Sequence, residues 1–165
     1  MVRRHQEFSK KNMEYFDTET NERYIPYVIE STYGLDRLIL AVLFEVLVEE
    51  ELEKGDIRLI LKINSSLAPI KVNVLPLIKK RHAEKARKVY TELAKYFTAS
   101  YDDAGNIGKR YRRGDAIGTL YAVTIDDTTL ENSTVTIRER DTMQQVTVSV
   151  EKLNSYLMDN MKIKV

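Results

Sequence analysis

The sequence has no cysteine and no tryptophan, and it contains only two histidines, six glycines and three prolines. Without cysteine, neither a disulfide nor a thiolate-bound metal can form. His5 and His82 lie in separate segments, so a histidine-based zinc site is not expected either. The low glycine and proline content argues against long disordered stretches, and hydrophobic residues, at 43%, suffice for a core. The composition therefore predicts a folded chain without a metal site.

Long hydrophobic runs are also missing. The longest, from Leu38 to Phe44, is broken by Glu45 and is much shorter than the ~20 residues that span a membrane. The N-terminus is polar and charged, which is not typical of a signal peptide. We therefore expect a cytoplasmic chain with no membrane association. Its 165 residues can form one domain, or a small domain with an appendage.

Charge is distributed unevenly, although the net charge is only +1. Residues 1–70 contain nine Lys or Arg and thirteen Asp or Glu, whereas residues 71–165 contain seventeen and twelve. A basic second half favours an anionic partner, but ordinary surface charge explains the asymmetry equally well.

Hydrophobic periodicity predicts alternating strands and helices, and hence an α/β fold with a mixed five-stranded sheet flanked by helices. The expected strands of the sheet are 70–77, 98–102, 119–125, 133–140 and 146–150. The expected helices are 82–97, 107–118 and 151–161, with a loop at 126–132. Ahead of the sheet we expect a strand at 23–30, a helix at 35–51, a turn at 54–56 and a short strand at 59–63.

Residues 30–37 combine the end of a strand, a tight turn and the start of a helix. Gly34 permits the turn, exposed backbone N–H groups there suit an anion, and the Arg37 guanidinium suits phosphate oxygens. Glu30 can accept hydrogen bonds from an ammonium group. The simpler interpretation is a turn glycine followed by a solvated helix start, and the pattern by itself favours that interpretation.

The predicted helix at 107–118 is strongly basic. Lys109, Arg112 and Arg113 are spaced i, i+3 and i+4, so they share one cationic face. Such a face holds phosphates, although most charged helix faces are merely solvated.

Apolar and polar side chains alternate along the strand predicted at 133–140. Val135 and Ile137 point one way, and Thr136, Arg138 and Arg140 point the other. We expect the second face to be exposed, where its donors can bind unstacked bases. The alternative is a polar, solvated sheet face.

A wider pattern is carried by five segments: Arg4–Ser9, Asn21–Arg37, Leu67–Val72, Ile107–Gly118 and Thr134–Met143. Together they resemble the C-terminal part of class II glycyl-tRNA synthetases of the archaeal and eukaryotic type. The resemblance extends from the third catalytic motif to the end of the anticodon-binding domain, and it covers essentially the whole chain.

This resemblance implies a strand–helix remnant of the catalytic domain, with motif 3, in residues 1–57, and an anticodon-binding domain in residues 58–165. Glycine would then be bound by Glu30, Ser31, Thr32, Tyr33 and Gly34. ATP, with Mg²⁺ in the complete enzyme, would be bound by Gly34, Leu35, Asp36 and Arg37. The tRNA(Gly) anticodon would be bound by Lys109, Arg112, Arg113, Arg138, Arg140 and Thr142.

The chain also departs from the family. Ser31 replaces the usual proline, which leaves the turn less rigid, and Gly114, Ala116 and Leu120 replace the usual Gln, Glu and Pro. Motifs 1 and 2 find no counterpart, so no residue is assigned a catalytic or metal-binding role. We expect the chain alone neither to bind ATP tightly nor to form glycyl-adenylate. Its expected partners include the rest of the catalytic domain or a companion chain, in a complete enzyme that is a homodimer.

Three functional hypotheses remain open from the sequence. The chain is part of a glycine–tRNA ligase, or a non-catalytic accessory module that binds structured nucleic acid, or a stand-alone nucleotide-binding regulator. Retention of Glu30, Gly34 and Arg37 favours the first, because a pure binding module needs no ATP-contacting turn. ATP binding without any response to tRNA would favour the third.

Overall fold

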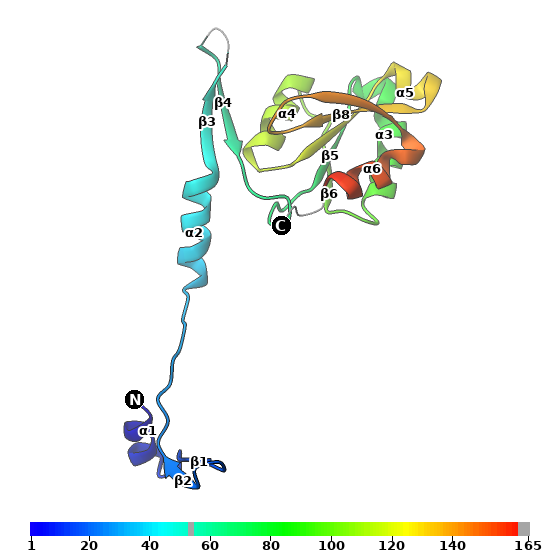
Figure 1. Cartoon of the computed structure of the whole chain (residues 1–165). Helices are drawn as coiled ribbons and strands as arrows, with labels where there is room; N and C mark the ends of the chain where they lie inside the picture. The colour runs from blue at the N-terminus through cyan, green and yellow to red at the C-terminus, as the bar shows by residue number, and fades with distance from the viewer. Residues whose placement is uncertain (53–54, 162–165) are drawn as a thin grey trace. The chain divides into compact units, whose positions relative to one another are not determined.

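The computed structural model describes residues 1–52 and 55–161 and divides into two compact units, Met1–Leu38 and the chain from Ile39 onward (Figure 1). The first unit contains the helix α1 (Val2–Ser9) and a hairpin of β1 (Tyr15–Asp17) and β2 (Glu22–Tyr24). Tyr15 and Tyr24 lie opposite each other in this hairpin. Their rings contact edge to face, with 5.7 Å between the ring centroids.

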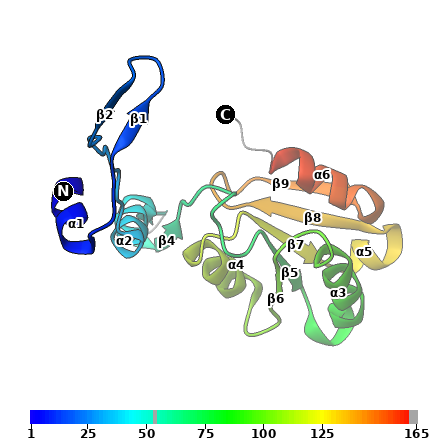
Figure 2. The same ribbon diagram turned by 90° about the horizontal axis from the view of Figure 1, so that it is seen from below.

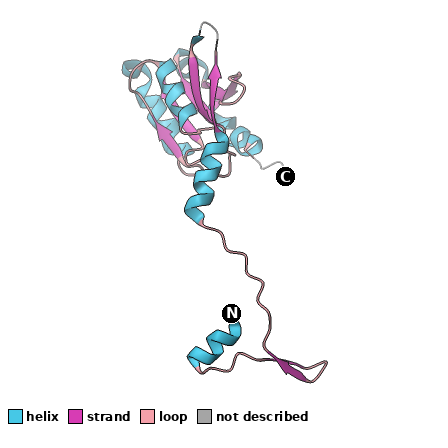
Figure 3. Ribbon diagram, turned by 90° about the vertical axis from the view of Figure 1, so that its left-hand side faces the viewer, coloured by secondary structure: helices cyan, strands magenta, loops and turns pink. Residues whose placement is uncertain are grey.

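The strand predicted at 23–30 forms only as far as Tyr24. Residues 25–34 contain neither helix nor strand, as Figure 3 shows. A strand persists where its backbone N–H and C=O groups bond to a neighbour, and in the described chain β2 pairs with β1 alone. The β-branched composition of this segment therefore did not suffice to predict a strand.

The helix predicted at 35–51 ends early. The helix α2 (Leu35–Val46) passes directly into β3 (Leu47–Glu51), which pairs antiparallel with β4 (Ile57–Leu61). This pairing places Glu50 opposite Arg58, a cross-strand ion pair that the helical pattern did not indicate. The turn predicted at 54–56 contains Gly55 with φ of 73°, and Lys54 lies outside the described residues.

All residues of α2 belong to the described chain, and none of them is buried. Leu38, Ile39, Leu40 and Phe44 are each at least half exposed. The helix is apolar around most of its circumference, so its sequence is that of a helix with neighbours on several sides.

The main body of the second unit is a five-stranded mixed sheet in the order β6-β5-β7-β8-β9. Its strands are β5 (Val72–Pro76), β6 (Ala99–Tyr101), β7 (Tyr121–Ile125), β8 (Thr134–Glu139) and β9 (Gln145–Ser149). β5 runs parallel to β6 and β7, and β8 runs antiparallel to β7 and β9. The predicted fold class is confirmed, with each strand within about two residues of its expected place.

The helices of this unit are α3 (Lys79–Leu93), α4 (Ile107–Ala116), α5 (Asp127–Asn132) and α6 (Leu153–Asn160), with a 3₁₀ turn, η2, at Val150–Lys152. α3, α5 and α6 gather at one side of the sheet and α4 at the other (Figure 1). The predicted loop at 126–132 is instead α5, because Asp126 and Thr129 form a capping box that satisfies the first turn. No helix among the described residues combines the length and the apolarity needed to cross a bilayer.

The two faces of the sheet differ in chemistry, because successive strand residues point to opposite faces. One face contributes Val72, Val74, Val123 and Ile137 to a hydrophobic core with α3 and α6. The face under α4 contains polar side chains, among them Asn73, Thr124 and Arg138, which are also buried. The α4 face is therefore held by hydrogen bonds and ion pairs as much as by apolar packing. Figure 2 shows α4 toward the left of the sheet and α3, α5 and α6 toward its right.

Gly118 follows α4 at a position that allows no side chain. Its φ is +82°, and a Cβ atom there would lie 2.7 Å from Cγ2 of Ile63. We expect Gly118→Ala to lower the free energy of unfolding by ~2–4 kcal/mol, because backbone strain and overpacking add. Urea unfolding measures this loss. Gly105→Ala is the matched control, since Gly105 has φ of +71° but open surroundings, and it should lose ~1 kcal/mol. Equal losses in the two variants would contradict the proposed clash.

Candidate nucleic-acid interface

The basic helix predicted at 107–118 is confirmed as α4, which ends at Ala116. Asn106 caps it, with its side-chain Oδ1 accepting a hydrogen bond of 2.9 Å from the backbone N–H of Lys109. Arg110 is buried and anchors the helix, donating to the backbone carbonyls of Asp103 (3.2 Å), Gly105 (2.6 Å) and Pro76. The start of α4 is therefore fixed to the carboxyl end of β5.

Lys109, Arg112 and Arg113 lie together along an open groove of about 610 Å³ between α4 and β4. Apolar side chains of β4, Ile57 and Leu59, also line this groove. The predicted clustering of these three cations is thus found in the structure, and apolar surface lies beside it. Such a combination accommodates phosphates and the flat faces of bases.

Two of the three cations already have carboxylate partners. Arg112 pairs with Asp56 and donates a 3.0 Å hydrogen bond to the carbonyl of Ile57. Arg113 pairs with Asp102 at 2.6 Å, and Lys109 has no ion-pair partner within the described residues. The face is therefore less positive than its sequence suggests, and an anion must compete for Arg112 and Arg113.

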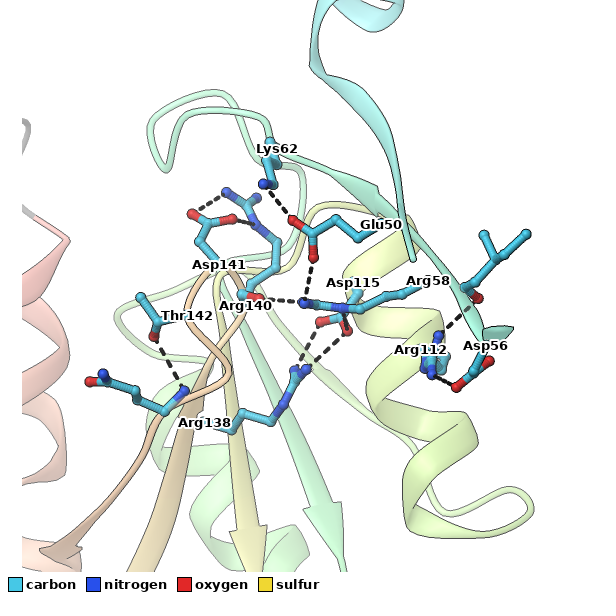
Figure 4. Close-up of polar contacts among 12 residues, drawn as sticks. Glu50, Asp56, Arg58, Lys62, Arg112, Asp115, Arg138, Arg140, Asp141 and Thr142 are labelled. Atoms are coloured by element: carbon cyan, nitrogen blue, oxygen red, sulfur yellow. Dashed lines mark hydrogen bonds and ion pairs between the residues drawn. The ribbon is translucent and has the colours of Figure 1, made fainter. Parts of the chain in front are cut away.

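Arg138 does not lie on an exposed sheet face. It is 7% exposed and donates to both carboxylate oxygens of Asp115, at 3.0 and 3.2 Å (Figure 4). Its guanidinium also lies 4.9 Å from the ring centroid of Tyr111, whose hydroxyl is 2.7 Å from Thr124 Oγ1. The alternation of β8 correctly separated the two faces, but α4 covers the face that we expected to be exposed.

Arg140 is buried as well, at 3% exposure. Its Nη1 donates to three backbone carbonyls at 2.9–3.0 Å, and the remainder of the guanidinium pairs with Asp141. The carbonyls belong to Leu61, Ile63 and Gly118. Arg140 thus joins the end of β8 to the end of β4 and to the turn after α4.

Thr142 is exposed in the turn between β8 and β9. Its hydroxyl donates to Glu139 Oε2 at 2.7 Å and accepts from the backbone N–H of Gln144 at 3.2 Å. Met143, which follows, has a φ of 58°. The turn is therefore held by local hydrogen bonds at the end of the strand that contains Arg138.

Three residues that sequence reasoning missed organise this region: Glu50, Arg58 and Asp115. Arg58 donates to Asp115 Oδ2 at 2.9 Å and to Glu50 Oε2 at 3.2 Å. Asp115 is 2% exposed and is shared by Arg58 and Arg138. The available signal was that Asp115 is the single acidic residue among the basic residues of the predicted helix at 107–118.

Protonation equilibria are shifted near both faces of the sheet. The pKa of Asp103, in the loop before α4, is lowered chiefly because Lys79 donates a hydrogen bond to its carboxylate. Burial is the main cause that raises the pKa of Tyr121 to about 12. At neutral pH, Asp103 therefore stays charged and Tyr121 stays neutral.

The residues expected to bind glycine and ATP are all exposed. Thr32 Oγ1 donates a 2.9 Å hydrogen bond to Glu30 Oε1, and the carbonyl of Gly34 accepts from the N–H of Leu38 at 3.0 Å at the start of α2. Ser31, Tyr33, Leu35, Asp36 and Arg37 lie in this same segment. Within residues 1–52 and 55–161, no group of three or more His, Cys, Asp or Glu side chains is placed to hold a metal ion.

The second unit therefore combines a mixed five-stranded sheet, α helices on both faces, and a basic helix beside an open groove. Residues 71–160 match the family of anticodon-binding domains, and the chain belongs to that family. The matched range begins just before β5 and includes every strand of the sheet together with α3 to α6.

Particular relatives extend this similarity to almost the whole chain. The chain is 50% identical over 161 residues to a glycine–tRNA ligase of Clostridium acetobutylicum, covering 98% of this chain and 35% of that protein. It is 51% identical over 158 residues to a glycine–tRNA ligase of Clostridium kluyveri, covering 96% of this chain and 34% of that protein. The chain thus spans about a third of the length of the curated relatives it matches.

A solved structure shows the same fold. The RNA-binding domain of threonyl-tRNA synthetase from Cryptosporidium parvum superimposes with a TM-score of 0.55, over 70% of this chain and 35% of that one. Sequence identity is 22%, so this likeness is one of fold.

Proposed function

We propose that this chain is the portion of a glycine–tRNA ligase that recognises the anticodon of tRNA(Gly). The observation that carries the proposal is the match of residues 71–160 to anticodon-binding domains, within a chain about 50% identical to glycine–tRNA ligases along 98% of its length. The open groove beside α4 is lined by three cations and by apolar side chains of β4, which supports the assignment of RNA as the ligand. As a component of translation, the chain would act in the cytoplasm.

The proposed tRNA contacts fall into two groups. Lys109, Arg112, Arg113 and Thr142 are exposed or half-buried, so RNA can reach them without any change in the fold. Arg138 and Arg140 are buried and already have partners within the fold, so we expect them to contact the anticodon by exchanging a present partner for RNA. We expect the first group to contact phosphates. We expect the second group to contribute to anticodon binding by keeping the end of β8 in one conformation.

We also propose that residues 30–37 supply the motif 3 edge of the aminoacylation site, in an enzyme of the archaeal and eukaryotic type. Glu30 to Gly34 would line the glycine pocket, and Gly34 to Arg37 would contact ATP. Their exposure fits surfaces that another part of the enzyme covers, and Arg37 at the first turn of α2 suits phosphate oxygens. Mg²⁺ is usually bound through substrate phosphates and one or two carboxylates, so we expect the ion to enter the site of the complete enzyme together with ATP.

The functional boundary would lie at residues 57 and 58, between the motif 3 edge and the anticodon-binding domain. On this account, the exposed apolar helix α2 packs against the rest of the catalytic domain or a companion chain, in a homodimeric enzyme. Catalysis requires both substrates to be clamped, so the chain alone is expected not to form glycyl-adenylate. A non-catalytic accessory module with the same fold is the alternative function.

The experiment that tests the assignment compares two RNA hairpins of equal length and charge. One copies the anticodon arm of tRNA(Gly) and the other its acceptor arm. We expect the purified chain to bind the anticodon hairpin at least tenfold more tightly, because base contacts add ~1–3 kcal/mol each to phosphate attraction. Equal affinities, or a preference for the acceptor hairpin, would refute the assignment as an anticodon reader.

A further inference from the structure

Arg58 is a fully buried arginine of β4, and it lies outside the segment that matches the anticodon-binding family. Each of its guanidinium nitrogens has a different partner. Nε donates to Asp115 on α4 at 2.9 Å, Nη1 donates to Glu50 on β3 at 3.2 Å, and Nη2 donates to the backbone carbonyl of Arg140 (Figure 4). One guanidinium therefore connects the β3–β4 hairpin, the basic helix and the end of β8.

Arg58 acts on Arg138 through their shared carboxylate. Asp115 accepts two hydrogen bonds from Arg138 and one from Arg58. Both carboxylate oxygens are therefore bonded, and Arg58 and Arg138 hold the same Asp115 side chain in place. If Arg58 is removed, Asp115 Oδ2 loses one of its two hydrogen-bond donors, so we expect the carboxylate and Arg138 to be held less firmly.

Arg58 also acts directly on the backbone at the end of β8. The carbonyl of Arg140 accepts its Nη2 hydrogen bond, and the N–H of Arg140 donates to the carbonyl of Leu120 at 2.9 Å. Both backbone groups of Arg140 are thus fixed, two residues before Thr142 in the exposed turn. A site whose parts are held in place before binding loses less conformational entropy when its ligand arrives.

We propose that Arg58 is a positioning residue for anticodon recognition: it holds the RNA-facing end of β8 through the Asp115 carboxylate and the Arg140 carbonyl. The inference rests on the proposed function, and it assigns a role in anticodon discrimination to a residue that is too buried to touch RNA. A lysine at this position retains the charge but cannot donate to three groups at fixed angles.

The test uses Arg58→Lys, with Glu50→Gln as the matched control in the same hairpin. Glu50→Gln changes a partly exposed partner of Arg58 and leaves the contacts to Asp115 and Arg140 in place. For each protein, the dissociation constant is measured for tRNA(Gly) and for the same tRNA with an altered anticodon. We expect Arg58→Lys to reduce the ratio of the two constants about tenfold, and Glu50→Gln to change it less than about twofold.

Salt dependence separates positioning from phosphate binding. Arg58→Lys should leave the slope of log affinity against log salt concentration unchanged, because the buried Arg58 side chain binds no phosphate. A folded Arg58→Lys variant with the discrimination of the parent would overturn the proposal. So would a variant that fails to unfold cooperatively, since Arg58 would then be required for folding. If the parent chain itself shows no discrimination, it is the proposed function that fails.

Discussion

Asp115→Asn should lower the free energy of unfolding by ~3–5 kcal/mol, the largest stability loss we expect from a single side-chain change in this chain. Asp115 is 2% exposed and neutralises two buried guanidinium groups, those of Arg58 and Arg138. The substitution keeps the size of the side chain but removes its charge, leaving two cations in a buried site with a neutral amide between them. Urea unfolding followed by circular dichroism measures the loss.

Asp56→Asn is the control for this prediction. Asp56 pairs with Arg112 at the rim of the groove, where its side chain is 60% exposed. The same chemical change there should cost less than ~1 kcal/mol, because solvent screens exposed ion pairs. If both variants lose less than ~1 kcal/mol, the buried ion pairs of Asp115 with Arg58 and Arg138 do not hold the β3–β4 hairpin to the sheet.

Removing the three cations of the groove together should have the largest effect on RNA binding. We expect Lys109→Ala, Arg112→Ala and Arg113→Ala, combined in one variant, to reduce the salt slope of tRNA binding by about 3, because each of these cations neutralises about one phosphate. Affinity at low salt should fall at least about a hundredfold. Fluorescence anisotropy with labelled tRNA, across a salt series, measures both quantities.

The matched control removes the same charge from the other side of the sheet. Lys80 and Lys88 on α3, and Lys95 just beyond it, are all exposed. Their triple alanine variant has an equal net charge, so it reports the effect of overall charge alone. Equal losses in the two triple variants would mean that tRNA is attracted by the whole domain, and that the groove beside α4 has no special role.

Much of the sheet was predictable because its strands are short β-branched runs between recognisable turns. The exceptions have local causes. The capping box of Asp126 and Thr129 made a short helix from a segment whose composition is typical of a loop. β3 formed where a helix was expected, because pairing with β4 outweighed the apolar run that continues from α2.

The site was predictable only in part. Spacing along one helix correctly grouped Lys109, Arg112 and Arg113, since this depends on local geometry. The burial of Arg138 and Arg140 depends instead on what covers the sheet. The Arg58–Asp115 pair joins residues 57 positions apart, and the contact from Arg58 to the Arg140 carbonyl spans 82. No periodicity in the sequence reports contacts at such separations, and the polar core beneath α4 therefore emerged only from the structure.

Anticodon recognition by this chain is tested most directly by its affinity for tRNA(Gly) and for the same tRNA with the anticodon changed, across a salt series. We expect a preference for the glycine anticodon that persists as salt rises, because base contacts survive when phosphate attraction is screened. Equal affinities that vanish together at higher salt would contradict it. Binding would then be attraction to phosphates alone, and the accessory-module alternative would be the better description.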